Sequence, residues 1–139
     1  MKLITRNTDY AIRALCCIAG GGKEIVSANQ LVKNLDMPRP FLRKILQTLN
    51  KEGILLSYKG KGGGFSFGIS PKKVNITHIM KIFQGPIKIN ECTFKKEICP
   101  NVNHCLLKNK LDEIGKEIIV KLEKITIDSL LENGNHRKL

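Results

Sequence analysis

The fold is decided by the stretch Ile54-Leu55-Leu56-Ser57-Tyr58-Lys59-Gly60-Lys61-Gly62-Gly63-Gly64-Phe65-Ser66-Phe67-Gly68-Ile69. Both of its ends are short runs of apolar and aromatic residues, a composition typical of strands. The six residues between them, 59–64, are Lys and Gly only, which predicts a flexible and basic loop. The stretch therefore predicts a β-hairpin with a positively charged tip. A phosphate-binding enzyme loop would need Gly-x-Gly-x-x-Gly or Gly-Lys-Ser/Thr, and neither pattern occurs here.

Three helices are predicted before this hairpin. The first covers residues 6–20 and ends at a run of three glycines. The second begins at Ser27, because Ser27-Ala28-Asn29-Gln30 has the pattern of a capping box. The third begins with Pro40, which suits the first turn of a helix, and runs to about Asn50. Two short helices joined by a tight turn and followed by a basic hairpin predict a winged helix-turn-helix.

The rest of the chain is predicted to be helical around an irregular loop. A short helix starts at Asn75 and ends at Gly85-Pro86, and a long amphipathic helix covers residues 105–123. Thr126 can cap a last helical turn. The long helix carries an apolar stripe too large for a lone arm to hide, so we expect it to pack against the head, a second copy, or both. The stripe consists of Leu107, Leu111, Ile114, Ile118, Leu122 and Ile125.

These patterns predict a mainly α fold with a small β-hairpin. The winged helix-turn-helix head comes first, and a long C-terminal dimerisation helix follows it. The predicted parts are a DNA-binding domain over 1–85 with its wing at 54–69, a cysteine loop over 86–104, the dimerisation helix and a short terminal helix over 105–132, and a polar tail over 133–139.

The positive charge of the chain is unevenly distributed. Its 139 residues carry a net charge of +12. Residues 1–75 hold 13 Lys and Arg against 4 Asp and Glu, a net +9, whereas residues 76–139 hold 11 against 8, a net +3. A basic front half predicts a surface that binds a polyanion, although lysine-rich proteins often owe such charge to solubility alone. Neither a signal peptide nor a run of about 18 apolar residues is visible, so we expect a cytoplasmic protein with no membrane partner.

The residues that would contact double-stranded DNA follow from the helix-turn-helix. Its second helix meets base edges in the major groove through its N-terminal part. Arg suits bidentate contact with guanine and Gln with adenine, while the alternative is contact with phosphates alone. Lysines and glycines at the hairpin tip would approach the backbone or the minor groove, and a helix N-terminus can anchor a phosphate. The candidates are Arg39, Arg43, Lys44 and Gln47 on the helix, Lys59, Lys61 and Gly62 on the hairpin, and Ser27.

Three of the five cysteines lie in one loop, in the pattern Cys92-x6-Cys99-Pro100-x4-Cys105. Without a secretory signal, they do not indicate a disulfide framework. Thiolates favour iron-sulfur clusters, zinc or copper(I). The gaps exceed the two- to four-residue steps of most zinc sites, so an iron-sulfur cluster is the leading interpretation. A zinc site, a bare thiol redox switch and inert cysteines stay open as alternatives.

A cluster usually needs a fourth protein ligand. His104 directly precedes Cys105 and could complete a Cys3His zinc site, but neighbouring residues seldom both face one metal. Asp9 in the first helix is a distant candidate, available if the fold or a dimer brings it to the loop. The two remaining cysteines, Cys16 and Cys17, lie in an apolar helical stretch and are expected to be core residues.

The whole chain resembles the bacterial winged-helix regulators that include IscR, the regulator of iron-sulfur cluster assembly, and NsrR, the nitric-oxide-sensing repressor. The resemblance rests on the start of the chain, the end of the third predicted helix, the wing and the three spaced cysteines. The matching stretches are Met1-Lys2-Leu3, Thr8-Asp9-Tyr10-Ala11-Ile12-Arg13-Ala14-Leu15, Leu49-Asn50-Lys51-Glu52-Gly53-Ile54-Leu55 and Lys59-Gly60-Lys61-Gly62-Gly63-Gly64-Phe65.

The resemblance implies a homodimer built on the long helices, with a cluster held by the three loop cysteines near the partner's DNA-binding head. In IscR the fourth ligand is a histidine, and Lys108 occupies that position here. In NsrR an aspartate of the first helix, from the other subunit, serves instead, and Asp9 matches it. The resemblance therefore favours Asp9 as the fourth ligand and a 4Fe-4S over a 2Fe-2S cluster.

The predicted function is a dimeric transcriptional regulator, a repressor, whose operator affinity is controlled by an iron-sulfur cluster that senses redox state, nitric oxide or iron-sulfur status. One alternative is a winged-helix regulator without a cluster, using zinc or thiols. Another is a dimeric adaptor that acts through a protein partner. No triad order or carboxylate pair is visible, so an enzyme with a small-molecule substrate is not predicted.

Overall fold

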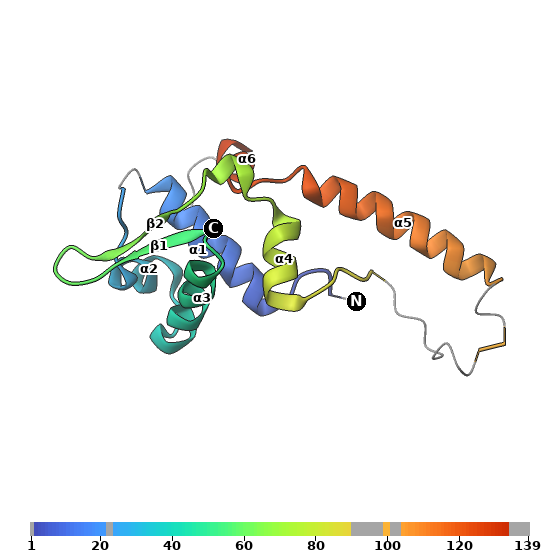
Figure 1. Cartoon of the computed structure of the whole chain (residues 1–139), viewed down its shortest axis with the longest axis horizontal. Helices are drawn as coiled ribbons and strands as arrows, with labels where there is room; N and C mark the ends of the chain where they lie inside the picture. Colours follow the sequence, from blue (N-terminus) through green and yellow to red (C-terminus); the bar gives the residue numbers. More distant parts are fainter. Residues whose placement is uncertain (1, 22–23, 90–98, 101–103, 134–139) are drawn as a thin grey trace.

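The computed structural model describes residues 2–21, 24–89, 99–100 and 104–133 of the chain. These residues are mainly helical and include a two-stranded hairpin, which confirms the predicted fold class (Figure 1). The elements are, in order, α1 (Arg6–Gly20), α2 (Ala28–Leu35), α3 (Arg39–Lys51), β1 (Leu55–Tyr58), β2 (Gly64–Phe67), the 3-10 helix η1 (Pro71–Lys73), α4 (Ile76–Gln84), α5 (Leu106–Glu123) and α6 (Ile127–Asn133).

The helix ends follow the signals in the sequence. Ser27 and Gln30 form the predicted capping box at the start of α2. Thr126 caps α6, because its hydroxyl accepts a hydrogen bond from the Ser129 amide at 3.1 Å. α3 begins one residue before Pro40, which occupies its first turn. The short 3-10 helix η1, which Ser70 caps and Pro71 begins, was not predicted.

The core of the head is built around α1. This helix contacts α2, α3, α4 and α6. Leu15 on α1 and Leu46 on α3 are fully buried, and Cys16 is buried as predicted. Cys17, by contrast, is only partly buried, and its sulfur accepts a hydrogen bond from the Asn34 amide group at 3.6 Å. Because α1 packs against α3, the position of one helix constrains the other.

The hairpin is joined to the helices through its second strand. β1 and β2 pair antiparallel, with Leu55 opposite Phe67 and Tyr58 opposite Gly64. On its other side β2 forms a bridge to Val26, just before α2. The hairpin is therefore fastened to the helix-turn-helix, a contact that the strand pattern alone did not predict.

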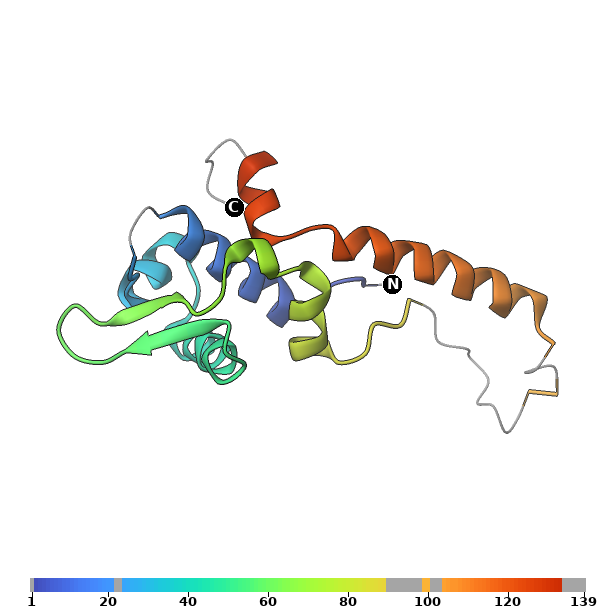
Figure 2. The same ribbon diagram turned by 45° about the horizontal axis from the view of Figure 1, so that its top comes forward.

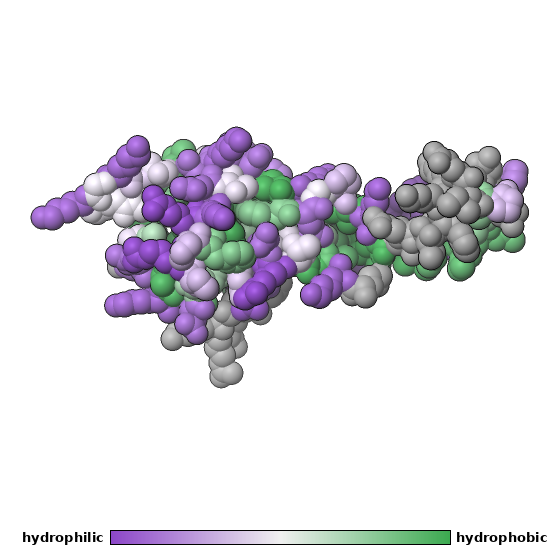
Figure 3. All heavy atoms as spheres, turned by 90° about the horizontal axis from the view of Figure 1, so that it is seen from below, coloured by the Kyte–Doolittle hydropathy of each residue, from purple (hydrophilic) through white to green (hydrophobic). Residues whose placement is uncertain are grey.

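α5 forms an arm that extends away from the head (Figures 1 and 2). Its C-terminal half packs beside α4, where Leu122 and Ile118 join a second apolar cluster with Ile76 and Met80. Toward its N-terminal end the apolar stripe is exposed, with Leu107 68% and Ile114 50% accessible. Figure 3 shows apolar side chains along this part of the surface. None of the helices in the described ranges is long and apolar enough to span a bilayer.

Candidate nucleic-acid interface and cysteine segment

α3 presents one polar face and one buried face. Its apolar side chains Leu42, Ile45, Leu46 and Leu49 are buried in the head. Its opposite face carries the four predicted base-reading residues, all of them exposed, and these are Arg39, Arg43, Lys44 and Gln47. The helical spacing thus separates core residues from residues free to reach a ligand, as predicted.

A groove of about 360 Å³ lies between the start of α2, α3 and the hairpin. Arg39 and Arg43 line it from α3, and Tyr58 and Gly64 line it from the hairpin. Its walls therefore come from all three parts of the winged helix-turn-helix. A duplex that contacted α3 would meet the hairpin at the same time.

Asn29 on α2 is a member of this groove that sequence reasoning missed. The Arg39 guanidinium donates a hydrogen bond to its side-chain oxygen. This contact joins α2 to the first residue of α3 across the turn. The signal in the sequence was weak, since an exposed Asn in the first turn of a helix is common and has no chemistry of its own.

The hairpin tip projects two cations beyond the groove. Lys59 and Lys61 are exposed. The tip is a tight turn in which the Gly63 amide donates to the Gly60 carbonyl at 3.0 Å. Gly62 has φ of 75°, a conformation that residues with side chains rarely adopt. A glycine turn without side chains, flanked by two lysines, suits close contact with the phosphate backbone of DNA.

Ser27 has a more limited part in this surface than the sequence suggested. Its hydroxyl accepts from the Gln30 amide at 3.2 Å, and its own amide donates to the Gln30 side chain at 3.0 Å. The capping box thus occupies the side chain. A phosphate at this end of α2 would be bound through the amides of Ala28 and Asn29 in the first turn.

The structure describes two of the three predicted cysteine ligands, and Cys92 lies outside the described residues. Cys99 and Cys105 are free thiols and partly buried. Cys105 is the N-cap of α5, and its sulfur accepts a hydrogen bond from the Lys108 amide at 3.4 Å. A helix N-terminus stabilises negative charge, so this position suits a metal-bound sulfur.

The described residues do not by themselves assemble a metal site. Among them, no three His, Cys, Asp or Glu side chains come together. His104 is exposed beside Cys105. Asp9 is paired with Arg13 at 2.9 Å on α1, while the N-terminal end of α5 lies away from the head (Figure 1). Within one chain Asp9 is thus separate from the α5 end that carries Cys105.

The donor set nonetheless fits an iron-sulfur cluster or a soft metal. Two free and partly exposed sulfurs, those of Cys99 and Cys105, belong to residues that precede one helix in the sequence, and a third cysteine is close in sequence. Thiolates are the ligands that iron-sulfur clusters use. Cys16 is unsuitable for this chemistry, because burial, with a smaller effect of neighbouring Cys17, raises the pKa of its thiol from 9.0 to about 11.

Comparison with known proteins identifies the family. Residues 4–133 match the family model Rrf2, described as an iron-dependent transcriptional regulator. The chain belongs to the Rrf2 family. A putative HTH-type transcriptional regulator of Aquifex aeolicus is 32% identical, covering 88% of this chain and 86% of that protein. The HTH-type transcriptional regulator NsrR of Bacillus subtilis is 29% identical over 96% of this chain and 92% of its own length.

Solved structures confirm the fold. CymR, the global cysteine regulator of B. subtilis, superimposes with a TM-score of 0.82 and 19% identity, covering 97% of this chain and all of that one. IscR of T. potens superimposes with a TM-score of 0.74 and 20% identity, covering 96% of this chain and 88% of that one. The resemblance to regulators such as IscR and NsrR is thus confirmed. This Rrf2 protein is a transcriptional regulator that binds DNA and not an enzyme.

Proposed function

We propose that this Rrf2 protein is a homodimeric repressor whose affinity for its operator is controlled by an iron-sulfur cluster. The cluster would be held by Cys92, Cys99 and Cys105. The observation that carries the proposal is the free Cys105 sulfur at the N-terminus of α5, with Cys99 also free, in a family described as iron-dependent.

The groove between α2, α3 and the hairpin supports the proposed mode of DNA binding. α3 would enter the major groove with Arg43 and Gln47 toward base edges, and the hairpin lysines would contact the backbone. A dimer would present two copies of α3 to half-sites one helical turn apart, or a multiple of it. A change in the spacing of the heads would then change operator affinity.

The exposed apolar residues of α5 support the proposed dimer. Leu106 is 81% exposed and Leu107 68%, and both lie at the end of the arm next to the cysteines. Exposed apolar surface of this kind normally marks an interface. A second α5 related by a two-fold axis would cover it with the same residues.

We assign the fourth ligand to the partner subunit's Asp9. The resemblance to NsrR favours an aspartate at this position and with it a 4Fe-4S cluster. In the described chain the Asp9 carboxylate is engaged by Arg13, and it is only partly buried. The carboxylate would have to leave Arg13 to bind a cluster. The Arg13 guanidinium would therefore keep its ion pair with Asp9 in the cluster-free protein and lose it in the cluster-bound protein.

When bound, the cluster would supply the chemistry that responds to nitric oxide, to oxygen or to a shortage of iron. The protein's own contribution is positional. Through the cluster, the cysteines would hold the segment before α5 against the arm. The partner subunit's Asp9 would hold the partner's head at the same cluster. Loss of these contacts would release each head from the partner subunit's arm.

The test is an absorption spectrum of protein purified without oxygen, with iron and acid-labile sulfide counted on the same sample. A brown protein with matching iron and sulfide is expected, and their ratio to monomer gives the cluster type. Cys99→Ser should remove the colour, whereas the control Cys17→Ser should keep it. A colourless protein that holds zinc, or no metal, would contradict the cluster and favour a structural metal or a thiol switch.

Operator dependence requires a second measurement. A duplex selected from a random library by the protein can be titrated with cluster-loaded and cluster-free samples. We expect a difference of about tenfold or more, within the usual range for coupled binding sites. Equal affinities would separate the cluster from regulation even if the cluster is present.

A further inference from the structure

α4 is fastened to the rest of the molecule at both ends. At its N-terminal end, residues 74–76 pair with the connection between α5 and α6 in a short antiparallel bridge. The Ile76 amide donates to the Ile125 carbonyl and the Ile127 amide to the Val74 carbonyl, each at 2.9 Å. The base of the arm and the start of α4 are therefore joined through their backbones.

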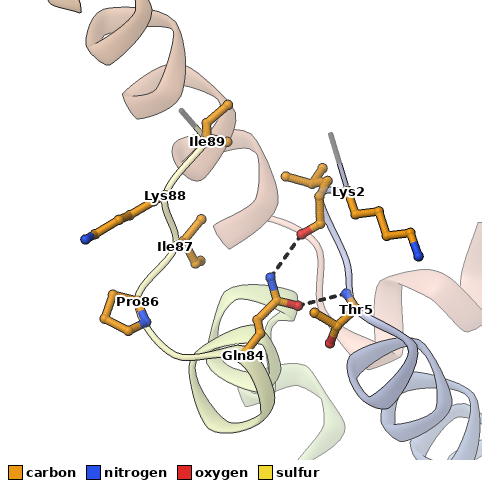
Figure 4. A pocket seen from close by; sticks show the side chains of 8 residues that line it. Lys2, Thr5, Gln84, Pro86, Ile87, Lys88 and Ile89 are labelled. Atoms are coloured by element: carbon orange, nitrogen blue, oxygen red, sulfur yellow. Dashed lines mark hydrogen bonds between the residues drawn. The ribbon is translucent and has the colours of Figure 1, made fainter. Parts of the chain in front are cut away.

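At the C-terminal end of α4, Gln84 makes three hydrogen bonds to the start of the chain. Its side-chain oxygen accepts from the Thr5 amide at 3.0 Å and from the Thr8 hydroxyl at 2.8 Å. Its side-chain nitrogen donates to the Leu3 carbonyl at 3.0 Å. Figure 4 shows Gln84 between the N-terminal segment and the segment that follows α4. Thr8 is fully buried, so Gln84 partners a hydroxyl that water does not reach.

The segment after Gln84 leads directly toward the cysteines. It turns at Gly85, where φ is 76°, and passes along α5. Ile87 belongs to the second apolar cluster, and Ile89 lies beside Gly115 of α5. A pocket of about 210 Å³ separates this segment from the N-terminal residues. The amide group of Gln84 thus joins the end of α4 to the N-terminal segment at a place where side chains do not fill the space between residues 86–89 and that segment.

Two of the residues held by Gln84 belong to the helix that supports α3, since Thr5 is the N-cap of α1 and Thr8 lies in its first turn. Tyr10, two residues after Thr8, packs edge-on against Phe41 of α3, with ring centroids 5.3 Å apart and an interplanar angle of 80°. A displacement of the first turn of α1 would therefore reach α3 through this aromatic contact.

We propose that Gln84 is the positioning residue through which residues 86–89, which precede the cysteines in the sequence, set the placement of α1 and α3. This inference rests on the proposed function, because it needs residues 86–89 to take different paths in the cluster-loaded and the cluster-free protein. A change in the path of residues 86–89 moves Gly85 and the side chain before it. The three hydrogen bonds then carry the movement to Thr5 and Thr8, and to Asp9 beside them.

The variants separate the hydrogen bonds from the size of the side chain. Gln84→Met keeps the length and removes all three bonds. Gln84→Glu keeps an oxygen that accepts from Thr5 and Thr8 and loses the donor to Leu3. Lys81→Met is the matched control, since Lys81 is an exposed residue in the same last turn of α4. Thr8→Val is a second and milder variant, in case Gln84→Met does not fold.

The decisive quantity is the ratio of operator dissociation constants of the cluster-free and cluster-loaded dimer. For Gln84→Met we expect the ratio to fall from about tenfold or more to about twofold or less. Gln84→Glu should keep most of it, Thr8→Val should lose part of it, and Lys81→Met should match the unmodified chain. A merely structural residue would weaken both states alike and leave the ratio unchanged.

Hydrogen exchange of cluster-free protein adds a readout that does not depend on the cluster. Exchange in residues 2–9 should rise in Gln84→Met and stay unchanged in Lys81→Met. An unchanged large ratio, or unchanged exchange, in folded Gln84→Met would overturn the inference alone. A ratio of one in the unmodified protein would overturn the proposed function together with the inference that rests on it.

Discussion

Val26 and Phe65 exchange two backbone hydrogen bonds, 2.9 Å and 2.8 Å long, that join the second strand of the wing to the residue before the α2 cap. The groove between α2, α3 and the hairpin therefore has a fixed width at this point. Gly64, the residue before Phe65 in the wing, lies directly against the same backbone. A Cβ at Gly64 would come within 2.3 Å of the Val26 carbonyl oxygen.

Gly64→Ala should push the wing away from α2. A methyl group cannot be accommodated against a backbone oxygen, and overpacking of this kind costs about 1–3 kcal/mol. We expect a lower midpoint of thermal unfolding and weaker DNA binding. Gly60→Asn is the control, because a Cβ there meets nothing within 4 Å and Asn tolerates positive φ. Equal DNA binding by the two variants would show that the wing does not need this contact.

Arg43→Ala and Lys61→Ala should weaken DNA binding in different ways. Arg43 lies on the exposed face of α3 and lines the groove, so its loss should cost about 1–3 kcal/mol on the preferred sequence and little on random duplex. Lys61 at the wing tip should weaken binding to all duplexes and lower the salt slope by about one. Titrations at several salt concentrations distinguish them. A uniform loss for Arg43→Ala would reassign it to a phosphate contact.

The sequence was sufficient for the elements because their signals are local. The Ser27–Gln30 capping box and the glycines of the wing specify helix starts and turns without help from distant residues. The hairpin strands were predicted one or two residues off at their ends, since β2 begins at Gly64, which has no side chain to signal a strand.

Contacts between distant residues could not be predicted in the same way. Gln84 and Thr8 are 76 residues apart, and a Gln at the end of a helix is ordinary until α1 lies beside it. The Val26 bridge to the wing has the same character. For the site, the number and spacing of the cysteines could be read from the sequence. The source of the fourth ligand could not, because it depends on how a second subunit is placed.

The buried thiol of Cys16 should make the folded protein less stable at alkaline pH. Burial raises the pKa of its thiol from 9.0 to about 11 in the folded protein. Above pH 9 the unfolded chain therefore releases a proton that the folded chain retains, so unfolding becomes more favourable as pH rises. The stability linked to this thiol is fully present below pH 9 and is lost toward pH 11, by on the order of 1–3 kcal/mol.

Denaturant unfolding at pH 8 and pH 10.5 measures this effect, and Cys16→Ala isolates it. Lysines and tyrosines also titrate in that range, so the relevant quantity is the difference between the two proteins at each pH. The stability advantage of the Cys16 protein should shrink at the higher pH. A constant difference would mean that the thiol ionises alike in both states.

Ile114→Lys should weaken the proposed dimer without unfolding the head. Ile114 and Leu107 lie two turns apart on α5 and are 50% and 68% exposed in the single chain, so a charge there costs the monomer little. A two-fold interface would meet the new lysine twice, and like charges would face each other across it. Sedimentation velocity should show monomer at concentrations where the unmodified protein is a dimer. Glu123→Gln changes the charge by the same one unit on the opposite side of the helix and should stay dimeric. In the proposed dimer both heads contact the operator, so Ile114→Lys should also lose affinity for a two-half-site duplex and keep its weak affinity for a single half-site. A dimer that survives the change would place the interface elsewhere.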